Sequence, residues 1–129
     1  MPTLNELTNP EPYTVRRGTS LLLVANAMLE KNVGCAVVVD EERRPIGLLT
    51  ERDIVKGYLY FPQRKIHLVR SEEVMDSNPV TLRNTDDVTE AAGLLRERGA
   101  RFAPVVSVEG AIVGLLSSSA LSSALPAAE

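Results

Sequence analysis

The sequence has few of the residues on which reactive sites and membrane anchors depend. It contains one cysteine, one histidine and no tryptophan, and aromatic residues make up 4% of the chain. A single cysteine excludes an intramolecular disulfide and a zinc site built from several cysteines. No apolar run approaches the roughly 18 residues that a transmembrane helix needs, and no basic-then-apolar signal pattern opens the chain. We therefore expect a cytoplasmic protein with no membrane partner.

The charged residues carry no pattern typical of an active site. The formal net charge is −3 at pH 7, so a basic surface for nucleic acid is not expected. The sequence lacks the His, Cys and Asp spacing of metal sites and the glycine-rich loop that precedes Lys and Ser or Thr in phosphate-binding loops. We therefore expect a protein that is not an enzyme and that requires no metal or other cofactor.

An internal repeat at a constant offset of 67 residues is the main feature of the sequence. Aligning residues 13–58 with 80–125 without a gap gives 11 identical pairs in 46. The alignment places Gly47-Leu48-Leu49 on Gly114-Leu115-Leu116. A match of this length indicates two copies of one supersecondary unit.

Each copy contains a helix with recognisable start and stop residues. Ser20 and Asp87 are typical N-cap residues, and Asp87 has Glu90 at the spacing of a capping box. Asn32 and Gly99 suit the left-handed residue that ends a helix. The predicted apolar faces consist of Leu21, Val24, Ala25, Met28 and Leu29 in copy one, and of Val88, Ala91, Ala92 and Leu95 in copy two.

The remaining pattern predicts strands and a second helix in each copy. An extended piece precedes the first helix, and a hairpin rich in β-branched residues follows it. We expect strands at 13–16, 36–39 and 45–49 in copy one and at 80–83, 103–106 and 111–116 in copy two, with final helices over 51–60 and 118–125.

The predicted fold class is therefore α/β (α+β), with two tandem β-α-β-β-α repeats. We divide the chain into repeat one (1–60), a connector (61–78) and repeat two (79–129). Neither repeat is expected to bury enough apolar area to fold alone. The two repeats should therefore form one module with pseudo-two-fold symmetry, and the cleft between them is the expected ligand site.

Several stretches of this sequence resemble the CBS domain family. One is Val74-Met75 before Asn78-Pro79-Val80-Thr81. Val39-Asp40 followed by Gly47 to Ile54 is similar to the family's strand-turn-strand-helix signature, and Phe102 to Val106 with Gly114 to Ser117 is similar in copy two. The resemblance covers about residues 12–125. It implies two tandem CBS repeats, a pair often called a Bateman module. Such modules bind AMP, ADP, ATP or S-adenosylmethionine and regulate another protein, which the sequence does not identify.

Thr50 and Asp53 are the main candidates for ligand binding. Thr50 stands where a strand gives way to a helix, and Asp53 follows in the first helical turn on roughly the same side. A carboxylate accepts hydrogen bonds from the hydroxyls of a ribose. The alternative is that both residues only cap the helix. The CBS resemblance favours ribose binding.

The other candidate ligand-binding residues come from the resemblance. It implies that Leu48 packs on the base and that Val80, Thr81 and Leu82 lie near it. It further implies that Arg101, three residues before Pro104, binds phosphate oxygens; an ordinary solvated arginine at a helix end is the alternative.

The two half-sites of the predicted cleft are unequal. Ser117 aligns with Thr50, but Ala120 replaces Asp53 and cannot accept a ribose hydroxyl. We therefore expect one strong nucleoside site. This loss also leaves open a structural or partner-binding domain with a vestigial ligand cleft.

A homodimer is expected because the predicted helices carry more apolar surface than so small a core can cover. In the alternative, the connector folds back over these helices. The residues expected to stay partly outside are Tyr58, Leu59, Phe61, Leu94, Leu95, Leu121 and Leu125.

Overall fold

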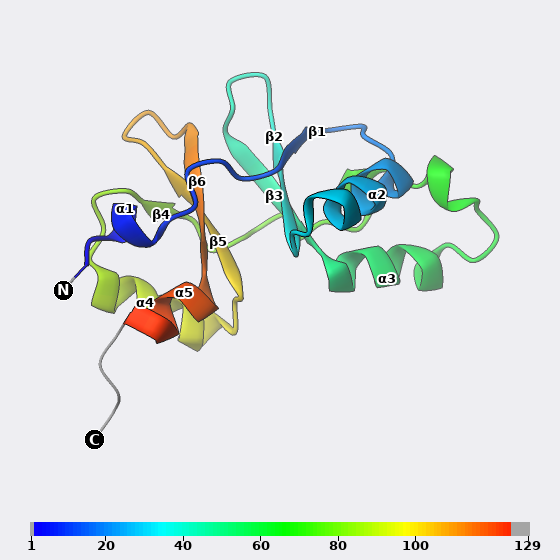
Figure 1. The fold of residues 1–129 in the computed structure, drawn as a ribbon. Helices are drawn as coiled ribbons and strands as arrows, with labels where there is room; N and C mark the ends of the chain where they lie inside the picture. The colour runs from blue at the N-terminus through cyan, green and yellow to red at the C-terminus, as the bar shows by residue number, and fades with distance from the viewer. Residues whose placement is uncertain (1, 125–129) are drawn as a thin grey trace. The chain divides into compact units, whose positions relative to one another are not determined.

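The computed structural model describes residues 2–124, which fold into two compact units. The first-repeat unit comprises Tyr13–Pro79. The second-repeat unit joins the chain up to Pro12 with the chain from Val80 onward. The two repeats have the same order of elements, and this is the predicted β-α-β-β-α order (Figure 1).

The first-repeat unit is built on a three-stranded sheet of order β1-β2-β3. β1 is parallel to β2, and β2 is antiparallel to β3, with a register shift between Val38 and Val39. Both α-helices of the unit lie on one face of this sheet (Figure 1). The elements are β1 (Thr14–Arg16), α2 (Leu21–Lys31), β2 (Cys35–Val39), β3 (Pro45–Thr50) and α3 (Glu51–Tyr60), followed by the 3₁₀ turns η1 (Ile66–Leu68) and η2 (Ser71–Glu73).

The second-repeat unit repeats this arrangement in a sheet of order β4-β5-β6, with β4 parallel to β5 and β5 antiparallel to β6. Its register shift falls between Val105 and Val106, the positions that align with Val38 and Val39. The elements are α1 (Leu4–Leu7), β4 (Leu82–Arg83), α4 (Val88–Arg98), β5 (Phe102–Val106), β6 (Ile112–Ser117) and α5 (Ser118–Ala124).

The start and stop residues predicted for α2 and α4 are confirmed. The Ser20 hydroxyl accepts a hydrogen bond from Leu23 N–H at 3.2 Å, and the Asp87 carboxylate accepts one from Glu90 N–H at 3.0 Å. Asn32 and Gly99 end the two helices at φ 54° and 62°. The sequence therefore fixes both ends of these helices through short polar caps and left-handed stops.

The helix faces that meet the cores are narrower than the sequence predicted. Leu21, Val24 and Met28 of α2 are buried, but Leu29 is 80% exposed, so its placement on the core face is wrong. Leu95 and Leu121 were expected to stay partly outside, and both are buried instead. The sheet of each unit buries only the helix residues that point directly at it, and residues at the edge of that helix face stay in solvent. Leu125, the last residue of the predicted final helix, lies outside the described residues.

Each repeat is preceded by a leader segment that packs on the body of the other repeat. Leader one (residues 4–12) belongs to the second-repeat unit, and leader two (residues 71–79) belongs to the first-repeat unit. Asn9 pairs with Leu115 of β6, and Asp76 pairs with Leu48 of β3, each through two backbone hydrogen bonds of 2.9–3.0 Å. The offset of 67 residues relates both pairs. The units therefore differ from the division into 1–60, 61–78 and 79–129.

The connector folds onto the first-repeat unit. Val69 and Ser71 are fully buried, and Ser71 donates to Thr19 O from both its backbone N–H and its hydroxyl. The connector nevertheless leaves α3 uncovered at Tyr58 and Leu59, which are 55% and 68% exposed. The alternative in which the connector hides these side chains is therefore wrong.

Candidate functional site

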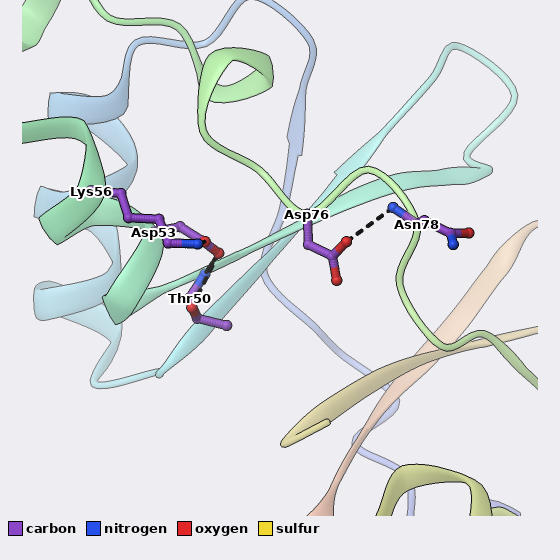
Figure 2. A network of polar contacts seen from close by, with 5 residues as sticks. All are labelled: Thr50, Asp53, Lys56, Asp76 and Asn78. Atoms are coloured by element: carbon purple, nitrogen blue, oxygen red, sulfur yellow. Dashed lines mark hydrogen bonds and ion pairs between the residues drawn. The ribbon is translucent and has the colours of Figure 1, made fainter. Parts of the chain in front are cut away.

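Thr50 lies at the junction of β3 and α3, where the backbone is still extended at φ −106° and ψ 173°. Asp53 follows in the first turn of α3. Its Oδ2 accepts hydrogen bonds from the Thr50 N–H at 2.8 Å and from the Thr50 hydroxyl at 3.1 Å (Figure 2). The structure thus brings the two predicted residues together, and it shows the capping role that the sequence left open.

The two carboxylate oxygens of Asp53 have different surroundings. Two donors occupy Oδ2, which matches its two lone pairs. Oδ1 lies 3.7 Å from Nζ of Lys56, an ion-pair distance too long for a hydrogen bond. Over residues 2–124, Oδ1 accepts no hydrogen bond. Capping and ligand binding therefore do not compete for the same oxygen.

The Asp53 side chain is nearly buried, with 9% of its surface exposed. A carboxylate in such a place needs compensation by donors and by a counter-charge. The Thr50 donors supply the first, and the partly exposed Lys56 ammonium supplies the second. This arrangement holds an oriented carboxylate whose Oδ1 accepts no hydrogen bond within residues 2–124 and faces only the Lys56 ammonium.

The matching position in the second-repeat unit has no carboxylate. The Ser117 hydroxyl accepts a hydrogen bond from Ala120 N–H at 3.2 Å and lies 3.2 Å from the Ser119 hydroxyl. The helix starts in the same way, but the group that could accept a ribose hydroxyl is absent at Ala120. α5 has no ionisable side chain at all over Ser118–Ala124.

Leu48 and Asp76 pair beside the Thr50 site. Leu48 is buried, with 5% of its surface exposed. Asp76 is exposed, and its Oδ1 accepts a hydrogen bond from Asn78 N–H at 3.0 Å (Figure 2). Asp76 was not predicted from the sequence. The short polar residue at the matching position, Asn9, could have indicated it, because its side chain makes the same contact and accepts from Glu11 N–H at 3.0 Å.

The other predicted ligand-binding residues lie in the second-repeat unit. Leu82 pairs with Val105, the residue after Pro104, so the two predicted residues lie on neighbouring strands. Thr81 and Arg101 are exposed, and the Arg101 carbonyl accepts a hydrogen bond from Ser118 N–H at 2.8 Å. This bond ties Arg101 to the start of α5. The three buried members of the set are Val80, Leu82 and Pro104.

Cys35 lies opposite Thr50 in the β2–β3 pairing and is buried. Burial, with a smaller contribution from the Asp53 charge, raises the pKa of its thiol to about 12. The thiol is therefore protonated at neutral pH and behaves as a small apolar side chain.

Residues 2–124 contain neither a cluster of metal ligands nor a membrane-spanning helix. No group of three or more His, Cys, Asp or Glu side chains in that part of the chain is placed to hold a metal ion. Of the helices between residues 2 and 124, none has the length and apolar character to cross a membrane.

Comparison with known proteins identifies the family. The sequence profile of the CBS domain matches residues 4–60 and again residues 71–127, two stretches separated by the offset of the repeat. The chain therefore belongs to the CBS domain family and contains two CBS domains. The matched stretches include both leaders, which the alignment from residue 13 had left out.

Solved structures share this fold over nearly the whole chain. A conserved CBS domain protein of unknown function from Thermoplasma acidophilum superposes with a TM-score of 0.86 at 27% identity, covering 97% of this chain and 70% of that one. A CBS domain protein from Pyrobaculum aerophilum, solved in complex with AMP, gives 0.82 at 26% identity and covers 92% of this chain and 89% of that one. The tandem CBS fold expected from the sequence is thus confirmed.

Curated sequence relatives are more varied in length. An uncharacterised 17.7 kDa protein from Acidianus ambivalens is 29% identical over 122 residues, which cover 95% of this chain and 72% of that protein. The chain spans less than half the length of two other relatives.

Proposed function

We propose that this chain is a regulatory module that binds one adenosine-containing ligand, with Asp53 as the acceptor for the ribose hydroxyls. The main support is that the two carboxylate oxygens of Asp53 have different partners. Oδ2 is fixed by the Thr50 donors, whereas Oδ1 keeps its hydrogen-bonding capacity. A ribose supplies neighbouring hydroxyl donors that suit such an oxygen.

The class of ligand is supported by similarity within the family. The Pyrobaculum aerophilum relative, which is 26% identical, was solved with AMP. We extend this to AMP, ADP, ATP or S-adenosylmethionine, all of which carry an adenosine with a free ribose diol. We further propose that the ligand is bound without being turned over, and that a second protein reads the bound state.

The remaining contacts are proposed from the family pattern. Leu48 would contact the base from the first repeat, and Val80, Thr81, Leu82 and Pro104 would contact it from the second. Arg101, an exposed residue, would bind phosphate oxygens through its guanidinium.

A thermal-shift series with AMP, ADP, ATP, GTP, NAD and S-adenosylmethionine tests this proposal. A ligand present at 100 times its Kd stabilises the folded chain by about 2.7 kcal/mol, which raises Tm by several degrees. We expect this rise with at least one adenosine ligand. If none shifts Tm at millimolar concentration, the structural or partner-binding alternative, which the Ala120 half-site favours, replaces the proposal.

Two variants make this test specific. Asp53→Asn keeps an amide oxygen that can accept from Thr50 N–H, but it places an NH₂ group where Oδ1 was. Asp53→Ala removes both functions. The proposal predicts that the Asp53→Asn variant keeps most of the thermal stability of the free protein and loses the ligand shift, whereas the Asp53→Ala variant loses both.

A further inference from the structure

Lys56 contacts the one oxygen of Asp53 that remains available. Its Nζ lies 3.7 Å from Oδ1, and Lys56 and Asp53 are separated by one turn of α3 (Figure 2). Side chains on a helix tilt toward its N-terminus, so Lys56 reaches back along the helix to the carboxylate. The lysine therefore approaches Asp53 from the C-terminal side, and Thr50 approaches it from the N-terminal side.

Lys56 is the only base of α3 that balances the charge of Asp53 directly. The helix contains Glu51, Arg52, Asp53 and Lys56, two acids and two bases. Arg52 is exposed and forms no ion pair within residues 2–124, whereas Lys56 pairs with the nearly buried Asp53. Removing Lys56 would leave a bare carboxylate at the place where the ligand is proposed to bind.

A bare carboxylate affects neutral and anionic ligands differently. A nucleoside presents only hydroxyl donors to Asp53, and these interact well with an unbalanced negative charge. A nucleotide also brings phosphate charges within several ångströms, and these are repelled by that charge. With Lys56 in place, the pair is neutral overall and this repulsion is largely cancelled.

We propose that Lys56 determines ligand class: by neutralising Asp53, it lets the site accept phosphorylated nucleosides as well as neutral ones. This inference rests on the function proposed above. Lys56 acts through Asp53, so it is a positioning and charge-balancing residue and need not touch the ligand. The second repeat has Ala120 and Ser123 at the matching positions and lacks both members of the pair.

Calorimetric titration with adenosine, AMP and ATP tests the inference in four proteins. The wild type is compared with Lys56→Gln, Lys56→Arg and the matched control Arg52→Gln, which removes one positive charge from the same helix without breaking the ion pair. For Lys56→Gln we expect roughly a threefold to tenfold loss for AMP at low salt, more for ATP and little for adenosine, with the loss shrinking as salt screens the charges. Lys56→Arg keeps the positive charge, so it should bind all three ligands with nearly wild-type affinity. Arg52→Gln should also bind them with nearly wild-type affinity.

Each other outcome has a definite meaning. Equal losses for adenosine and AMP in Lys56→Gln would show that Lys56 only supports the local structure, and this inference alone would fail. Equal effects of Lys56→Gln and Arg52→Gln would show a general charge effect and would overturn it as well. A wild-type chain that binds none of these three ligands would overturn this inference, and the proposed function would fall with it only if S-adenosylmethionine also failed to raise Tm in the thermal-shift series.

Discussion

Replacing Gly114 by alanine should release leader one from the second-repeat unit. A Cβ at Gly114 would stand 2.8 Å from the backbone oxygen of Asn9 and would overlap the Thr8 methyl group. The backbone cannot move aside as a flexible side-chain end could. The new methyl group therefore forces the leader away from β6.

The cost follows from the contacts that hold this leader. Asn9 and Leu115 exchange two backbone hydrogen bonds of 2.9 Å, worth about 1 kcal/mol each. Leu4 is 2% exposed in the core, and its burial contributes about 2 kcal/mol. The freed leader regains conformational entropy, which offsets part of this loss. We expect Gly114→Ala to lower the free energy of unfolding by about 2–3 kcal/mol.

Urea unfolding and amide hydrogen exchange measure this effect. The Asn9 and Leu115 amides should lose protection, whereas the matching Leu48 and Asp76 amides in the other unit should keep theirs. Gly93→Ala is the control: it lies in α4 with nothing within 4 Å of its added Cβ, so it should stabilise the helix by about 0.5–1 kcal/mol. A Gly114→Ala protein with wild-type stability and both amides protected would refute the packing of leader one.

We expect the chain to form a homodimer through the exposed α3 residues Val55, Tyr58 and Leu59. Sedimentation should then give about twice the mass of the 14.0 kDa chain, and the Leu59→Arg variant should sediment as the monomer. A wild-type chain that is monomeric at micromolar concentration would rule the dimer out. The pKa of the Cys35 thiol is raised from 9.0 to about 12 in the folded state, so the stability that the protonated thiol contributes is complete below pH 9 and declines as pH rises toward 12. The Cys35→Ala variant should lose this decline in the free energy of unfolding between pH 9 and 12. The same decline in wild type and variant would show that Cys35 does not cause it. Arg101→Ala should weaken AMP and ATP far more than adenosine in calorimetry, whereas equal losses would assign Arg101 a structural role.

The elements that could be predicted are those with strong local signals. Ser20 and Asp87 as caps, and Asn32 and Gly99 as stops, act through their own backbone geometry, so the sequence alone determines them. Leu29 could not be placed correctly because an apolar residue at the edge of a helical face is buried only if the sheet extends over it.

The leaders were missed because their two copies differ in residue type. Leu4 aligns with Ser71 and Thr8 with Met75, although each pair fills the same place in its unit. Two signals were available, since Glu6 and Glu73, like Pro12 and Pro79, are identical at the offset of the repeat. Each leader packs on the unit of the other repeat through contacts between residues far apart in the sequence, and local sequence patterns do not determine such contacts.

The candidate site was predictable in its residues but not in its geometry. The strand-to-helix junction places Thr50 and Asp53 together on spacing alone. The sequence could not say whether Asp53 would use one oxygen or both for the cap, because that depends on the side-chain rotamer. Within residues 2–124, the cap uses Oδ2 alone, and Oδ1 accepts no hydrogen bond and pairs only with Lys56.

Calorimetric titration of AMP into the wild type and Asp53→Asn tests the central claim most directly. We expect one site per chain, because only the first repeat has the carboxylate. It also predicts that Asp53→Asn loses about 1.5–3 kcal/mol of binding free energy, the range for a hydrogen bond to a charged group, while the variant unfolds at close to the wild-type temperature. Two equivalent sites per chain, or wild-type affinity in Asp53→Asn, would contradict the role assigned to Asp53.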